Sequence, residues 1–140
     1  MSKKLVAPPA PLPSEVHLTD THTHLYLDDF LMDTNADGCY GVTQRAIDTG
    51  VSRMIFPNVN VSTIEPMKAL AARFPDNIRM AMGLHPTEIV LETLDDDLAR
   101  VAAELTNGGY IAVGEVGIDL YWDKTCLLYT SPSPRDRSLS

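Results

Sequence analysis

Two histidines separated by a single residue are the first candidates for chemistry in this chain. They lie in the segment Leu18-Thr19-Asp20-Thr21-His22-Thr23-His24-Leu25. Alternate side chains of a β-strand point to the same face, so we expect Asp20, His22 and His24 to face one way. Two neutral imidazoles on one face can bind a single cation, and a neighbouring carboxylate can orient such a ligand. The alternative is a pair of polar residues in an ordinary turn.

Two further candidates, His85 and Glu115, each stand near the end of an apolar run. Imidazole and carboxylate groups both bind divalent cations and both contact polar substrates. The alternatives are a histidine that simply closes a strand before Pro86, and a loop carboxylate in water. The remaining histidine, His17, differs in strand parity from His22 and His24, so we interpret it as structural.

The elements that must position these side chains are predicted from the hydrophobic pattern. Strands are expected over 15–25, 51–57, 78–86 and 110–117, and helices over 40–49, 62–74 and 87–106. The second helix has an apolar stripe at helical spacing and Ser62 or Thr63 as its N-cap. Helices between apolar strands indicate parallel strands with right-handed crossovers, and therefore an α/β fold of about four β/α units. The carboxyl ends of such strands share one edge of the sheet, so we expect the four candidate residues to meet there.

The composition narrows the class of partner. The chain has 140 residues, of which 44% are hydrophobic and 21% charged, as in ordinary globular domains. Its formal net charge of −8 argues against a broad basic surface for nucleic acid or for an anionic membrane. A phosphate-bearing substrate stays compatible with this charge, because bound divalent cations can dominate the local field.

The cysteines and the amino-terminal segment indicate the compartment. Cys39 and Cys126 form no CxxC motif, so we expect free thiols in a reducing environment. Residues 1–14 contain four prolines and predict a flexible lead-in. Their apolar run is too short for a signal peptide, and no segment is long enough to span a membrane. We therefore expect a cytoplasmic protein.

An acidic segment, Asp33–Gly38, matches the start of a calcium-binding EF-hand loop. That loop needs a glutamate at its twelfth position, where this chain has Gln44. No helix is expected before the segment either. We interpret it as a solvated loop.

Three motifs taken together resemble the TatD-type metal-dependent hydrolases, which are described as deoxyribonucleases and grouped with the amidohydrolase-like TIM barrels. The motifs are Asp20-Thr21-His22-Thr23-His24-Leu25, Gly83-Leu84-His85-Pro86 and Gly114-Glu115-Val116-Gly117-Ile118-Asp119. The resemblance covers roughly residues 16–123. It implies a partial TIM (β/α)8-type barrel with parallel strands, corresponding to the amino-terminal half of the family's fold.

The resemblance also implies roles for individual residues. His22 and His24 match the family's first pair of metal ligands, and Glu115 matches its carboxylate ligand, which can bridge two cations and makes Glu115 the catalytic candidate. His85 matches a histidine that contacts substrate. The implied cofactors are one or two divalent ions, with Zn, Mn, Ni and Mg all compatible. The implied reaction is hydrolysis of a phosphodiester at DNA ends or in a small substrate.

The chain departs from the family pattern in its second half. A TIM barrel has eight β/α units in about 250 residues, and this chain predicts four. No histidine follows His85, whereas the family pattern continues with two histidines and an aspartate. We therefore expect weak cation binding and little or no turnover from the chain as given. The first and fourth strands would have open edges, which favour self-association.

These observations divide the chain into a lead-in at 1–14, a half-barrel at 15–124 and a tail at 125–140. The tail has two Ser-Pro steps and no helical or strand periodicity, so we expect it to be non-native or disordered. Asp119 and Asp123 are interpreted as positioning or solvated residues, and Trp122 as packing or substrate-facing. Two other functions stay open: another amidohydrolase-like barrel hydrolase, and a non-enzymatic metal-binding half-barrel.

Overall fold

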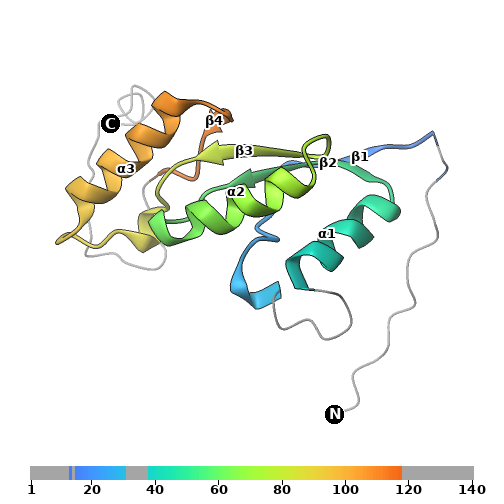
Figure 1. Ribbon diagram of the computed structural model, residues 1–140, viewed down its shortest axis with the longest axis horizontal. Helices are drawn as coiled ribbons and strands as arrows, with labels where there is room; N and C mark the ends of the chain where they lie inside the picture. Colours follow the sequence, from blue (N-terminus) through green and yellow to red (C-terminus); the bar gives the residue numbers. More distant parts are fainter. Residues whose placement is uncertain (1–12, 14, 31–37, 118–140) are drawn as a thin grey trace, which may run out of the picture.

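Parallel strands in chain order form the sheet of this protein (Figure 1). The structure is a computed structural model that describes residues 13, 15–30 and 38–117. Within those residues the sheet order is β1-β2-β3-β4 and every pairing is parallel. The strands are β1 (Leu18–Asp20), β2 (Val51–Pro57), β3 (Ile78–Met82) and β4 (Tyr110–Val113). The predicted α/β fold with parallel strands is confirmed.

Helices connect successive strands, as the sequence predicts. They are α1 (Gly38–Asp48), α2 (Ile64–Arg73) and α3 (Leu94–Asn107), with short 3-10 turns η1 (Asp28–Phe30), η2 (Val61–Thr63) and η3 (Pro86–Glu88). In Figure 1, α2 lies between α1 and α3. No helix among the described residues is both long and apolar enough to cross a membrane.

The core lies between the sheet and α2. Alternate residues of β2, Met54 and Phe56, are buried, and Ile78 and Met82 of β3 join them. The apolar stripe predicted for the second helix is buried in the same core, with Met67, Leu70 and Ala71 in α2 and Phe74 directly after it. This packing fixes the sheet, and it therefore fixes where the strands end.

Three strands end earlier than the sequence predicts. Residues 21–25, 83–86 and 114–117 follow β1, β3 and β4 as loops or turns instead of extending them. At β1 the cause is local, because the Asp20 carboxylate accepts the backbone N–H of His22 at 3.1 Å and turns the chain. The prediction that strand alternation aligns Asp20, His22 and His24 is therefore wrong.

Two helix starts also differ from prediction. Thr63, one of the two predicted N-cap residues, stands at the N-cap position of α2, but its side chain makes no capping hydrogen bond there. The side-chain cap is made by Asn60, which accepts the N–H groups of Ser62 and Thr63 and begins η2. The third helix starts at Leu94, not at residue 87, because His85 caps the separate turn η3 and Pro86 stands at its start.

A buried carboxylate joins α2, α3 and β4. Glu104 of α3 is 6% exposed. Its oxygens lie 3.1 Å from the Lys68 ammonium and 2.8 Å from the Arg100 guanidinium, and they accept the Tyr110 hydroxyl at 2.7 Å. That hydrogen bond from Tyr110 and the two cations lower the pKa of Glu104, against the opposing effect of its burial. The ionised carboxylate therefore holds three elements together.

Several predictions lie outside the described residues. They concern the lead-in at 1–14 apart from Pro13, the calcium-like loop at 33–37, the tail at 125–140, and Asp119, Trp122, Asp123 and Cys126.

Candidate metal centre

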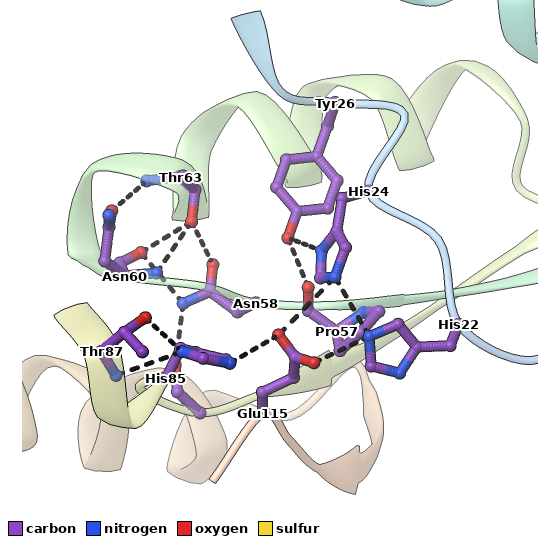
Figure 2. A network of polar contacts seen from close by, with 11 residues as sticks. His22, His24, Tyr26, Pro57, Asn58, Asn60, Thr63, His85, Thr87 and Glu115 are labelled. Carbon is purple, nitrogen blue, oxygen red and sulfur yellow. Dashed lines mark hydrogen bonds and ion pairs between the residues drawn. The ribbon is translucent and has the colours of Figure 1, made fainter. Parts of the chain in front are cut away.

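His22, His24 and Glu115 come together at the carboxyl edge of the sheet (Figure 2). The Nε2 atoms of the two histidines lie 3.1 Å apart. Glu115 Oε1 lies 2.7 Å from Nε2 of His22, and Oε2 lies 3.6 Å from Nε2 of His24. One ligand atom from each residue falls within 4.8 Å of the others. The sequence predicted this group of three.

The loop after β1, and not the strand, brings the two histidines together. Thr23 lies between them, and its N–H donates to the carbonyl of Ile55 in β2 at 3.2 Å. Together with the turn at Asp20, this bond holds the loop against the end of β2. Asp20 therefore acts on the His22 backbone and is not among the three clustered residues.

The spacing of the three side chains fits a divalent cation. Bonds of about 2.0–2.2 Å from one ion, at angles of about 90–110°, place neighbouring ligand atoms about 2.8–3.6 Å apart. The Nε2 atoms of the two histidines lie within this interval at 3.1 Å, and the two oxygens of Glu115 lie 2.7 and 3.6 Å from one histidine each. Two imidazoles and a carboxylate suit Zn, Mn or Ni, and they suit Mg when water supplies further ligands.

Tyr26 fixes which nitrogen of His24 faces the cluster. The Tyr26 hydroxyl donates its hydrogen to the Pro57 carbonyl, so it must accept a hydrogen bond from Nδ1 of His24 at 3.0 Å. Nε2 of His24 then keeps its lone pair toward His22 and Glu115. Burial lowers the pKa of His24, although the Glu115 carboxylate opposes the shift. The neutral imidazole is the form that binds metal.

Tyr26 itself is protonated and buried. Its side chain is 3% exposed. Burial, and after it the charge of Glu115, raise the pKa of the Tyr26 hydroxyl. The hydroxyl therefore stays protonated, and its two hydrogen bonds connect Nδ1 of His24 to the Pro57 carbonyl.

In contrast to His24, His85 points an N–H group and not a lone pair toward the cluster. Its Nδ1 accepts the backbone N–H of Thr87 at 3.2 Å and lies 2.7 Å from the Thr87 hydroxyl. A backbone amide can only donate, so neutral His85 carries its ring hydrogen on Nε2. That nitrogen lies 3.9 Å from Oε2 of Glu115. His85 therefore offers the site a donor, which suits an anionic oxygen better than a metal ion.

Sequence reasoning missed the residues that support the site. Tyr26 and Thr87 each lie two positions after the histidine that they orient, which is a detectable signal. Asn58 and Gly83 lie at the ends of other strands, and only the packing of the sheet reveals what they contact. The exposed His17 precedes β1 and is not among the clustered residues.

A parallel α/β sheet that collects histidines and a carboxylate at its carboxyl edge defines a class of metal-site proteins. Residues 19–128 match the family described as TatD related DNase. The chain belongs to this family, whose fold is a TIM barrel. The resemblance predicted from the three motifs is confirmed.

Similar proteins come from several bacteria. The chain is 33% identical over 110 residues to the uncharacterized metal-dependent hydrolase YjjV of Escherichia coli, with 74% of this chain and 38% of the relative covered. It is 30% identical over 108 residues to the uncharacterized metal-dependent hydrolase YabD of Bacillus subtilis, with 77% and 40% covered. An uncharacterized metal-dependent hydrolase of Haemophilus influenzae is 28% identical over 127 residues, with 83% and 47% covered. The chain thus spans less than half the length of these relatives.

Proposed function

We propose that this chain forms part of a metal-dependent hydrolase that cleaves phosphodiester bonds, specifically a TatD-type deoxyribonuclease acting on DNA ends or on small phosphodiesters. The observation that carries the proposal is the convergence of His22, His24 and Glu115, with the His85 donor beside them. The chain spans less than half of its relatives, so we assign turnover to a full-length protein and not to the chain as given.

In this proposal His22 and His24 bind the cation through Nε2, and Glu115 binds through its carboxylate. The two Glu115 oxygens face different histidines, an arrangement that also suits a carboxylate shared between two ions. A bound divalent cation supplies a lowered pKa for water and partial neutralisation of charge on the substrate. Nε2–H of His85 donates to a phosphate oxygen and so binds and orients the substrate.

The proposal includes Zn, Mn, Ni and Mg as alternative identities of the metal. It includes a cytoplasmic location, in keeping with the free thiol of Cys39. The competing functions are a barrel hydrolase for another bond and a metal-binding fragment without turnover. The donor at His85 favours an anionic substrate, and therefore favours the phosphodiester over an amide.

Metal binding is tested by calorimetric titration of the chain with Zn²⁺ and Mn²⁺. We expect one or two ions to bind, and we expect the double variant H22A/H24A to lower the affinity at least about 100-fold, since it removes two ligands at once. His17→Ala is the matched control, because it deletes an exposed histidine outside the cluster. Equal affinities for H22A/H24A and wild type would refute the metal site.

The substrate is tested on the full-length protein. We expect release of nucleotides from the ends of short DNA with Mn²⁺ or Mg²⁺, and loss of that activity in H22A. Hydrolysis of amides or carboxylic esters without any hydrolysis of DNA would favour the other barrel hydrolase. Tight metal binding with no hydrolysis of any of these would favour the non-enzymatic function.

A further inference from the structure

Asn58, directly after β2, is completely buried, with 0% of its surface exposed. Its Nδ2 donates to the carbonyls of Gly83 and Asn60 at 2.9 and 3.0 Å. Its Oδ1 accepts the hydroxyl of Thr63 at 3.0 Å. Every polar group of this buried amide is therefore paired, and Figure 2 shows it beside the cluster. A side chain so fully satisfied has one position.

The backbone of Asn58 contacts the segment after β4 that carries Glu115. The Asn58 N–H donates to the carbonyls of Ala81 and Gly114 at 3.0 and 3.2 Å, and the Asn58 carbonyl accepts the N–H of Glu115 at 3.0 Å. One residue thus joins the ends of β2, β3 and β4. The main chain of Glu115 is held directly by this junction.

Gly83 supplies the space that Glu115 needs. A Cβ on Gly83 would lie 2.4 Å from the carbonyl oxygen of Glu115 and 2.7 Å from the carbonyl carbon of Gly114. Both atoms belong to the backbone, so no flexible side chain can move aside. Any residue larger than glycine must therefore shift the main chain at position 83 or at Glu115, and so change how the two segments lie against each other.

We propose that Asn58 and Gly83 are positioning residues that set the carboxylate of Glu115 opposite His22 and His24. The inference rests on the metal role that we propose for Glu115. Neither residue touches the cation; each acts through the backbone of Glu115. Functional groups tolerate displacements of about 0.5 Å, and relief of the contact at Gly83 needs a shift of at least this size.

The test is a titration with Co²⁺, followed by visible absorption, because the spectrum reports the ligands and geometry of the ion. We expect Gly83→Ala and Asn58→Ala to weaken Co²⁺ binding about 10- to 100-fold, as loss of a residue supporting a ligand does. We also expect a changed spectrum, which loss of stability alone does not produce in the folded fraction.

Two controls make the same chemical changes at the other end of the sheet. Gly109→Ala adds a Cβ with no atom within 4 Å, but strains a backbone with φ of 93°. Asn77→Ala removes an amide that donates to the Ser52 carbonyl at 2.9 Å. Both controls destabilise the fold near the amino ends of strands, and we expect both to bind Co²⁺ as wild type does.

Thermal unfolding establishes that each variant is folded. If Asn58→Ala does not fold, Thr63→Val is measured in its place, because it removes the hydroxyl that donates to Asn58. Wild-type affinity and spectrum in Gly83→Ala and in the Asn58 variant or its replacement would overturn the inference.

A second readout separates this inference from the proposed function. If the wild-type chain binds no Co²⁺, the metal site fails, and positioning is then judged by hydrogen exchange of the Glu115 amide. We expect this amide to exchange faster in Gly83→Ala than in wild type or Gly109→Ala. Equal exchange in all three would show that Gly83 does not position Glu115.

Discussion

The two best-defined histidines of the site carry their ring hydrogens on different nitrogens. The Tyr26 hydroxyl accepts from Nδ1 of His24, whereas Nδ1 of His85 accepts from Thr87. In each case the partner lies two residues further along the chain. The same side chain therefore presents a lone pair to the cluster at one position and an N–H group at the other, which are the two roles that the proposed function assigns to them.

Tyr26→Phe tests this orientation. The variant leaves Nδ1 of His24 and the Pro57 carbonyl without the hydroxyl between them. We expect metal affinity to fall about 10-fold and the free energy of unfolding to fall by about 1 kcal/mol. Calorimetry and urea unfolding measure the two effects. Tyr40→Phe, the same deletion on an exposed position of α1, should change neither; unchanged affinity in Tyr26→Phe would show that the hydroxyl does not orient His24.

The sequence predicts the site residues better than the reason for their proximity. The pair His22 and His24 is predicted from its spacing, and His85 and Glu115 are predicted from their positions near the ends of apolar runs. Strand alternation was nevertheless the wrong explanation for the histidine pair, because Asp20 turns the chain before either histidine. Asn58 and Gly83 were not predictable, since their role depends on distances between separate strands.

At the scale of elements, Glu104 is a polar residue outside the site that links three elements. It is a buried carboxylate that contacts α2, its own helix and β4. Burial of a charge destabilises a protein unless partners compensate, and here one hydroxyl and two cations do so. The attachment of α3 to the sheet therefore depends on the ionised form.

Glu104→Gln should lower the free energy of unfolding at pH 7 by about 1–3 kcal/mol, because it weakens charge-assisted hydrogen bonds. The folded-state pKa of Glu104 is below its ordinary value of 4.5. Its stabilisation is therefore complete above that value and lost as the pH falls through the folded-state pKa. Urea unfolding between pH 7 and pH 3 should show the two proteins converging at low pH.

The control is Glu92→Gln, which neutralises an exposed glutamate before α3. We expect it to leave the free energy of unfolding within about 0.5 kcal/mol of wild type. A difference between Glu104→Gln and wild type that stays constant down to pH 3 would contradict a role for ionisation.

The accuracy of the predicted strand bounds also depends on whether the cause of each end lies within the strand or in another strand. The sequence predicted β2 exactly, because a run of apolar residues between turn signals is local information. The ends of β3 and β4 were predicted too late. Gly114 still donates to the Met82 carbonyl, but Glu115 donates to Asn58 instead, a change of partner that no pattern within one strand encodes.

At the scale of the whole molecule, the described sheet has β1 and β4 at its edges. Apolar side chains near these edges are exposed, with Ile111 at 56%, Val113 at 61% and Leu18 at 45%. Parallel edges that expose backbone and apolar groups pair readily with another chain. We therefore propose that the chain as given self-associates through these edges.

Sedimentation velocity over a range of concentrations tests this proposal. We expect concentration-dependent association of the wild-type chain, and we expect Val113→Lys to reduce it, because lysine at an edge strand opposes pairing. Val90→Lys, at an exposed position outside the strands, is the control and should associate like wild type. A wild-type chain that sediments as a monomer at every concentration would refute the proposal.

The cluster joins a loop after the first described strand to a residue after the last, so almost the entire described chain separates His22 from Glu115. During synthesis on the ribosome, both histidines emerge long before the carboxylate. Until Glu115 leaves the exit tunnel, the cluster lacks the carboxylate that faces both histidines. In the proposed metal site, the full set of three ligand residues is therefore complete only late in translation.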